Sequence, residues 1–312
     1  MLFYVSLRGA EGDPSLLQDR LLNLKCLGCL KDFRLLRFAR NDTTQNSELS
    51  TQHYPRMIVT TDAIVLRSRK QGDSSLICSL YTRSFGLVDV IAKGARQMKS
   101  KFGGGLELYT ELTAVFYKKH GRDLYLLSKA ETQKRSTKLQ ASLEKIEAST
   151  KIAELLLGTL HDEEENPKLY DLLQKTLGAL GECKNDSSVT AHLAAFYLAY
   201  AKLNGFEIST PAEIIADIHY AFDARSGGVI ELRSPLGEGS DTMIPITGEV
   251  VAALRHLTNA ANIDAGALRL SERGAYTLER IFRAYFALHF EGMRGANRSR
   301  SAKVFAQMGE KG

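Results

Sequence analysis

The chain has 312 residues, of which 44% are hydrophobic and 25% charged, and its formal net charge is +5. This is the composition of an ordinary soluble globular protein with room for two or three domains. The longest apolar run, at 192–203, is too short and polar to span a bilayer, and the opening MLFYVSL lacks the cationic start of a secretory signal. Four cysteines do not form a disulfide framework. We therefore expect a cytoplasmic protein with no membrane partner.

The positive charge is unevenly distributed. Residues 57–135 hold 14 Lys and Arg against 7 Asp and Glu, whereas 136–312 hold 19 against 23. A local excess of this kind is typical of a surface that binds a polyanion, most often nucleic acid. A solvated basic face is the alternative interpretation.

The first 56 residues differ from the rest. A polar run from Asn41 to His53 has no periodicity and is typical of a linker or a disordered segment. A regular strand pattern begins directly after Met57. We expect residues 1–56 to be a disordered extension or the product of a mis-assigned start, with Met57 as the natural first residue. A genuine N-terminal arm is the alternative.

The segment 57–135 has the period of strands. Five pieces have the pattern of short strands, at 57–69, 75–82, 86–95, 106–118 and 124–130. The link Arg83-Ser84-Phe85-Gly86 predicts a hairpin in which Gly86 has a positive φ. Five short strands with glycine-marked corners suit a small closed barrel, for which an OB-fold is the natural candidate. An SH3-like barrel is the alternative.

Beyond residue 136 the period becomes helical. Apolar residues recur every three or four positions at 137–160, 168–180 and 188–204. The stretch 208–240 is irregular, with strand-like pieces around 219–222 and 228–232. Helices resume at Thr247, and a long one at 271–290 precedes a basic tail with Arg294, Arg298, Arg300 and Lys303. We therefore predict a helical body for 136–312.

Common catalytic motifs are absent or incomplete. GARQMKS at 94–100 resembles a phosphate-binding loop, but Met98 stands where that motif needs glycine. There is no HExxH or Gly-x-Ser-x-Gly pattern. Cys26 and Cys29 have the spacing of metal ligands, but no second pair completes a zinc site. The acidic run HDEEENP at 161–167 is interpreted as a solvated turn rather than a metal site.

The loop KGARQMKSKFGGG remains as the main candidate site. It places Lys93, Arg96, Lys99 and Lys101 within nine residues, and its glycines let backbone approach a bulky polyanion. Phe102 lies among these cations and could stack on a base, as aromatic residues do in single-strand binders. Phe116, Tyr117 and Tyr125 lie on nearby strands and are more typical of core residues.

The run from Thr60 to Glu131 resembles the N-terminal OB domain of the RecO family of recombination mediators. The shared pattern comprises T-D-A-I-V-L-R, a T-R-x-x-G hairpin, K-G-A-R and K-S-x-F-x-G-x-L. Further support comes from A-x-L-N-G-F at 201–206 and from YAFDARSGGV at 220–229. The resemblance covers about 57–305 and excludes 1–56.

The resemblance implies a multidomain α+β protein: an OB barrel at 57–135, then a helical domain at 136–312 with a zinc-ribbon-like segment at about 206–240. It implies no enzymatic activity and no cofactor. A RecO-like protein binds single- and double-stranded DNA in the nucleoid, anneals strands, and with RecR helps RecA displace single-stranded DNA-binding protein. We expect DNA binding by base stacking on Phe102 and by phosphate contacts from cations of the barrel and loop: Arg67, Arg69, Lys93, Arg96, Lys99, Lys101, Lys118, Lys119 and Arg122.

The chain departs from this pattern in one respect. Many members of the family place four cysteines around the F-D-x-x-x-G-G segment, whereas no cysteine follows Cys183 here. We therefore predict no zinc, and expect apolar packing of residues such as Phe222, Val229 and Ile230 to hold the segment.

Two other functions remain open at this stage. One is an RNA-associated OB protein, which a comparison of DNA and RNA affinity would identify. The other is a nucleic-acid enzyme in which acids such as Asp217 and Asp223 bind magnesium, which metal-dependent cleavage would reveal.

Overall fold

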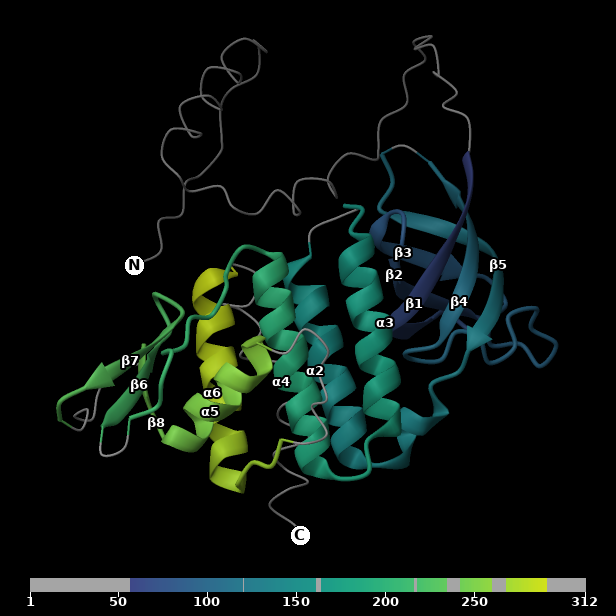
Figure 1. The fold of residues 1–312 in the computed structure, drawn as a ribbon. Helices are drawn as coiled ribbons and strands as arrows, with labels where there is room; N and C mark the ends of the chain where they lie inside the picture. Colours follow the sequence, from purple (N-terminus) through teal and green to yellow (C-terminus); the bar gives the residue numbers. More distant parts are fainter. Residues whose placement is uncertain are drawn as a thin grey trace, which may run out of the picture. The chain divides into compact units, whose positions relative to one another are not determined.

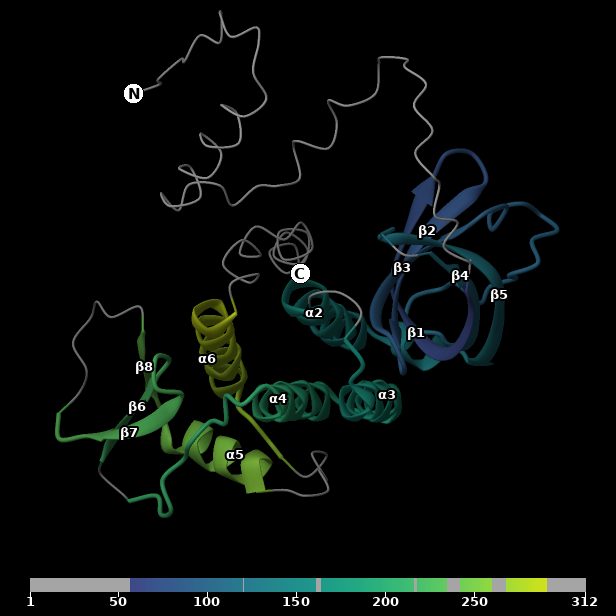
Figure 2. The ribbon, with the colours of Figure 1, turned by 90° about the horizontal axis from the view of Figure 1, so that it is seen from above.

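The N-terminal part of the described chain forms a closed barrel. The structure is a computed structural model that describes residues 57–119, 121–160, 164–215, 218–234, 242–259 and 268–290. Its first five strands are β1 (Met57–Gln71), β2 (Ser75–Thr82), β3 (Gly86–Ala92), β4 (Glu111–Lys118) and β5 (Leu124–Lys134). They close in the order β1-β2-β3-β5-β4, and Figure 2 shows them as a ring. The predicted OB barrel is confirmed. Residues 1–56, with the predictions made for them, lie outside the described residues.

The length of β1 allows it to close the barrel. Residues 57–64 of β1 pair with β4, and residues 63–71 pair with β2. The pairing shifts between Val65 and Arg67, and such a bulge bends and twists a strand. One face of each strand points inward because side chains alternate along a strand. The barrel core includes Val59, Val65, Leu80, Val90, Leu112, Phe116 and Leu127.

The predicted hairpin between β2 and β3 is present. Gly86 has φ +60°, and the hydroxyl of Thr82 donates to its carbonyl at 2.9 Å. Cys78, in the preceding strand, is fully buried, and this burial raises the pKa of its thiol.

Three strand boundaries were wrong: β3 ends at Ala92 rather than residue 95, β5 continues to Lys134 rather than residue 130, and the start of β4 differs most. The apolar pattern predicts a strand from Leu106, but β4 begins at Glu111. Leu106 and Tyr109 are buried as part of the preceding loop, and Tyr109 takes a positive φ of 62°. These residues are apolar because they anchor the loop, which a period-two pattern cannot distinguish from a strand.

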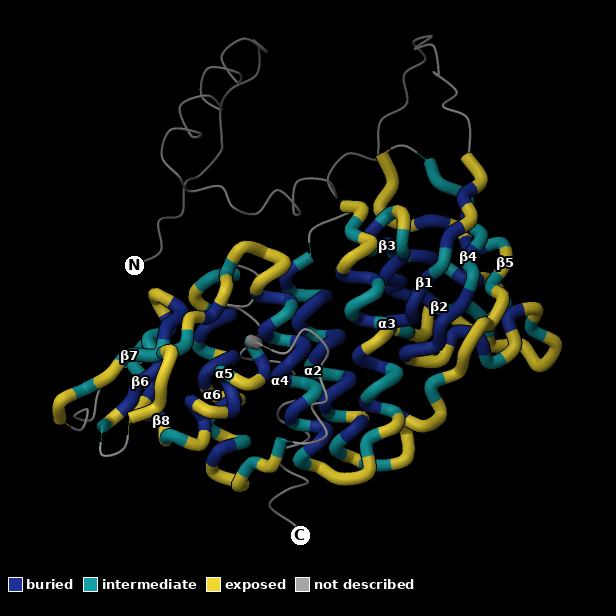
Figure 3. The backbone as a smooth tube through the Cα atoms, viewed as in Figure 1, coloured by how far each residue is buried: buried dark blue, intermediate teal, exposed yellow. Residues whose placement is uncertain are grey.

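The second half contains the predicted helices. They are η1 (Thr137–Ala141), α2 (Leu143–Thr159), α3 (Pro167–Glu182), α4 (Asp186–Leu203), α5 (Gly248–Asn259) and α6 (Glu272–His289), drawn in Figure 1. Side-chain caps fix several starts: Ser142, Asn166, Asn185 and Ser271 each accept from a backbone N–H three residues ahead. The cap at Ser142 divides the segment 137–160 into η1 and α2. Burial is greatest on the inner sides of these helices (Figure 3). No described helix has the length and apolar character needed to cross a membrane.

A small sheet lies between α4 and α5 in the chain. Its strands are β6 (His219–Asp223), β7 (Gly228–Leu232) and β8 (Met243–Ile246), in the order β7-β6-β8. The first two match the predicted strand-like pieces, and β8 was not predicted.

Apolar packing attaches this sheet to the helices. Phe222 is fully buried, its ring lies edge-on to Tyr285 of α6 at 5.9 Å, and Val229 packs on the same core. Ile230, expected to join them, is half-buried and is not part of that core. Within the described ranges, no three His, Cys, Asp or Glu side chains are grouped as a metal site would require.

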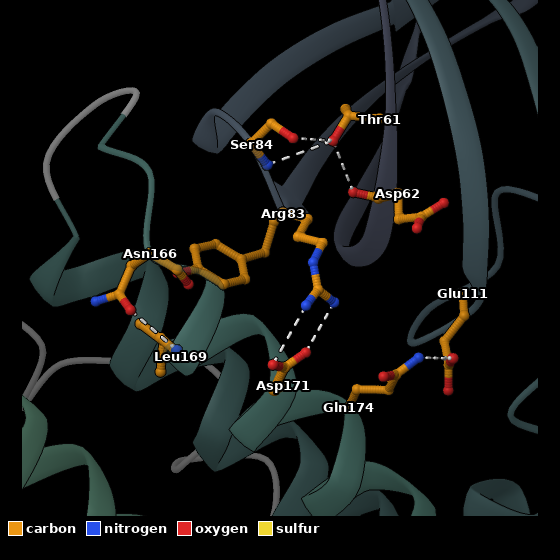
Figure 4. A network of polar contacts seen from close by, with 10 residues as sticks. Thr61, Asp62, Arg83, Ser84, Glu111, Asn166, Leu169, Asp171 and Gln174 are labelled. Carbon is orange, nitrogen blue, oxygen red and sulfur yellow. Dashed lines mark hydrogen bonds and ion pairs between the residues drawn. The ribbon is translucent and has the colours of Figure 1, made fainter.

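Helix α3 contacts the barrel through a set of polar interactions (Figure 4). Arg83 donates to both carboxylate oxygens of Asp171, at 2.8 and 3.3 Å, and Gln174 donates to Glu111 at 2.6 Å. The Arg83 and Asp171 side chains are 43% and 42% exposed, so this pair contributes at most about 1 kcal/mol and mainly fixes orientation. The apolar part comes from Ile64, Leu66 and Tyr81, which belong to the helical core.

We predict that Gly86→Ala is strongly destabilising. A Cβ atom there would lie 2.3 Å from the backbone oxygen of Glu164, and the positive φ adds strain. The matched control is Gly121→Ala, where φ is +73° but nothing lies within 4 Å. We expect the control to lose about 1 kcal/mol of unfolding free energy and Gly86→Ala to lose at least about 2 kcal/mol more. Equal losses in urea denaturation would contradict the predicted backbone contact.

Candidate nucleic-acid interface

The basic loop between β3 and β4 is attached to the β1–β2 hairpin. The backbone N–H of Arg96 donates to the carbonyl of Ser74 at 2.9 Å, and its Nη1 donates to the carbonyl of Gly72 at 3.1 Å. Gly72 lies at the hairpin tip with φ +57°. Ala92, which precedes Lys93, pairs with Leu76 of β2. The loop therefore begins beside the hairpin that carries Arg67 and Arg69.

Phe102 anchors this loop in the barrel. Its side chain is 4% exposed and belongs to the barrel core together with Leu106. The prediction that Phe102 offers a stacking platform for bases is wrong for this structure, because its ring is already covered by the barrel. The ammonium group of Lys101 lies 5.1 Å from the ring centroid. Phe102 therefore fixes the position of neighbouring cations.

The far end of the loop is fixed as well. The Tyr109 N–H donates to the carbonyl of Val65 at 2.7 Å, and its hydroxyl lies 3.2 Å from that of Thr150 on α2. The loop is thus bonded to the hairpin at its start, to the barrel core in its middle and to a helix at its end. A loop held at three points presents its cations at a low cost in conformational entropy.

The predicted cations form two groups at opposite ends of β1. Arg67, Arg69 and the loop cations belong to the β1–β2 end. Lys118, Lys119 and Arg122 belong to the β4–β5 turn, where Lys118 pairs with Met57, the first residue of β1. Arg67 lies ten residues further along β1, a separation of up to roughly 33 Å along the strand. The predicted site is therefore two clusters of cations.

Most of these cations are accessible. Seven of them are exposed: Arg67, Arg69, Lys93, Arg96, Lys99, Lys101 and Arg122. None of the seven forms an ion pair with a carboxylate of the described residues. Lys118 and Lys119 are half-buried, and the Lys118 ammonium lies 4.8 Å from the centroid of the Phe85 ring. A cation that is not paired with a carboxylate of the protein can bind an external anion.

Some features of this surface were missed by sequence reasoning. Lys70 is exposed next to Arg69 and adds to the hairpin group. Four exposed apolar side chains also lie on the barrel strands, with Met57 53%, Ile58 63%, Leu124 38% and Leu126 36% exposed. The sequence did contain a signal for Leu124 and Leu126. The run LYLL at 124–127 is apolar on both faces of a strand, whereas the outer face of a strand is normally polar.

Asp223, one of the two acids considered for magnesium, is held in a turn. Asp217 lies outside the described residues. Asp223 accepts from the Arg225 N–H at 3.0 Å and from the Ser226 hydroxyl at 2.8 Å. Although partial burial opposes ionisation, these hydrogen bonds lower the pKa of Asp223. Its carboxylate closes the β6–β7 turn, a structural role.

Comparison with known families identifies the chain. Residues 57–135 match the family model described as Recombination protein O N terminal, and residues 140–298 match Recombination protein O C terminal. The chain belongs to the RecO family. The N-terminal match contains β1 to β5, and the C-terminal match contains α2 to α6.

Individual relatives agree with this assignment. A protein called DNA repair protein RecO from Pelodictyon phaeoclathratiforme is 30% identical over 256 residues, which are 77% of this chain and 95% of that protein. One from Chloroherpeton thalassium is 28% identical over 81% of this chain and 99% of its own length. One from Chlorobium phaeobacteroides is 36% identical over 49% of this chain, but the match spans only 58% of that relative.

We predict that Phe102→Ala loosens the basic loop. Removing a buried phenyl ring should cost about 3 kcal/mol of unfolding free energy, and the loop 93–105 should become the first site of protease cleavage within residues 57–290. Met98→Ala is the matched control, because Met98 is in the same loop and fully exposed. The melting temperature and the cleavage pattern are the measurements. A Phe102→Ala protein as stable and as protease-resistant as Met98→Ala would show that Phe102 is no anchor.

Proposed function

We propose that this chain is a non-enzymatic DNA-binding mediator of DNA repair that uses the barrel as its main DNA surface. The observation that supports this proposal most directly is the loop 93–101. Four of its cations are exposed, and they are attached to a rigid frame through Arg96 and Phe102. Phosphates bind such cations whatever the base sequence, and this suits a protein that acts on many DNA sites.

Membership of the RecO family supports the finer steps of this proposal. The protein would bind both single- and double-stranded DNA and anneal complementary strands. With RecR it would help RecA replace single-stranded DNA-binding protein on DNA in the nucleoid. Cations on two sides of one barrel support annealing, because they would reduce the repulsion between two phosphate backbones held close together.

A strand-annealing assay tests the proposed function. Two complementary oligonucleotides, one with a fluorophore and one with a quencher, are mixed with the full chain, with and without single-stranded DNA-binding protein. The proposed function requires faster annealing in both conditions. Annealing at the protein-free rate in both conditions would refute it.

We predict that replacing Lys93, Arg96, Lys99 and Lys101 with Ala weakens DNA binding and reduces its salt dependence. Each lost phosphate contact should flatten the slope of log K against log salt by about 0.7 to 0.9. The matched control replaces four exposed cations of the helical half, Lys168, Lys175, Lys184 and Lys202. An unchanged affinity and slope in the folded loop variant would exclude this loop from the DNA site.

A further inference from the structure

A row of apolar side chains crosses the strands on the outside of the barrel. The pairing registers connect its members one by one, from β2 through β3, β5 and β4 to β1. The apolar row is Ile77, Ile91, Leu126, Tyr117 and Ile58. At the β2 end of the row, Ile77 also pairs with Arg69 of β1. The row therefore makes one full circuit of the barrel between two residues of β1, Arg69 and Ile58, which are eleven positions apart.

The members of the apolar row point away from the barrel interior. Their neighbours along each strand, among them Cys78, Val90, Tyr125, Phe116 and Val59, belong to the barrel core, and the row members do not. Because side chains alternate along a strand, the row faces outward. Ile58 is 63% and Leu126 36% exposed, Tyr117 and Ile91 are partly exposed, and Ile77 is buried at the end of the row.

The helices cover a different part of the barrel. Ile64, Leu66 and Tyr81 of the strands and Tyr109 of the loop belong to the helical core, and Leu87 of β3 packs against it. No member of the row belongs to this core or packs on it. The row is thus an apolar surface that the described part of the chain leaves partly open. Contiguous exposed apolar side chains on a soluble domain mark a binding site more often than chance.

Cations lie at both ends of the row. Arg69 pairs with Ile77 at the β2 end, while Lys119 lies two residues beyond Tyr117 along the chain. A carboxylate also lies near the row: Asp89, two residues before Ile91 on β3, pairs with Leu124 of β5. The path along the row around the barrel, from Ile77 to Ile58, crosses four strand spacings, about 19 Å. This distance fits a few nucleotides of single strand, within the roughly 4 to 16 that one OB-fold binds.

We propose that the apolar row contacts the unpaired bases of single-stranded nucleic acid while the flanking cations bind its phosphates. The inference rests on the proposed function and deepens it by separating two kinds of contact. The basic loop can bind phosphates of either a single strand or a duplex. The row can contact bases only in a single strand, because a duplex stacks its bases inside. The row therefore favours single strands.

Ile58→Ser combined with Leu126→Ser tests the row by affinity. Both side chains are exposed, so the folded state should survive the change. We expect binding of a single-stranded oligothymidylate to weaken about tenfold, with no change in the salt slope, and duplex binding to stay within about twofold. Leu143→Ser with Leu288→Ser is the matched control, because these side chains are 47% and 38% exposed on helices.

A second variant reports the contact directly. The chain contains no tryptophan, so Leu126→Trp introduces a single indole fluorophore into the row. Stacking of a base on this ring should quench its fluorescence when the oligonucleotide binds, and should tighten single-strand binding. Leu143→Trp on α2 is the control and should show no quenching.

The outcomes separate this inference from the proposed function. If the wild-type chain binds no DNA, the proposed function itself fails. If the wild type binds but the Ser variant binds single strands equally well, or Leu126→Trp is not quenched on binding, the row does not contact bases. Its occupant is then a protein partner or residues 1–56. An equal loss for single strands and duplexes, or a flatter salt slope, would likewise overturn the inference.

Discussion

The short parallel pairing of β3 with β5 closes the barrel, and the rest of the structure depends on this closure. It consists of three register pairs, Asp89 with Leu124, Val90 with Tyr125 and Ile91 with Leu126. Without it the five strands would form an open sheet with two edges, and edges are prone to pair with other chains. With it, Val90 and Tyr125 meet inside the barrel while Ile91 and Leu126 meet outside. The same strand pairing therefore brings together residues of the barrel core on its inner side and residues of the apolar row on its outer side.

The attachment of helices to the barrel combines weak polar contacts with a shared apolar core. Arg83 reaches Asp171 and also lies 5.5 Å from the ring centroid of Tyr170, which stacks with Tyr81 at 6.4 Å. Burial raises the pKa of both tyrosines, so neither ionises near neutral pH. The Tyr170 hydroxyl finds no hydrogen-bond partner among the described residues. Orientation at this junction depends mainly on shape and on Arg83, since the tyrosines contribute packing rather than charge.

Local patterns in the sequence predicted most of the elements. Alternation predicted β1, β2 and the start of β3, and the turn chemistry of Gly86 predicted the β2–β3 hairpin, because both signals act between near neighbours. The errors arose where long-range packing decides. Phe102 was expected on the surface and Leu106 in a strand, yet both lie in the loop before β4 and pack in the barrel core. β8 has four residues, too few to show a period, and its pairing with β6 defines it.

The candidate site also divides into features that local sequence shows and features that long-range contacts decide. The cations of the loop could be found from composition alone, but their arrangement could not. Arg96 is bonded to a hairpin tip 24 residues away in the chain, and no local signal reports that contact. The apolar row is more hidden still, because each of its members comes from a different strand and only the pairing registers bring them into line.

The stagger of the barrel gives this surface a handed geometry. Following the pairs around the barrel leads from Arg69 to Ile58 on the same strand, at a different height along the barrel axis. Strand tilt and stagger are linked in any closed barrel, so this offset cannot be removed without opening it. A polymer that follows the row therefore traces part of a screw and not a ring. Its two ends leave the barrel at different levels, and so a continuous strand can pass over the surface without crossing itself.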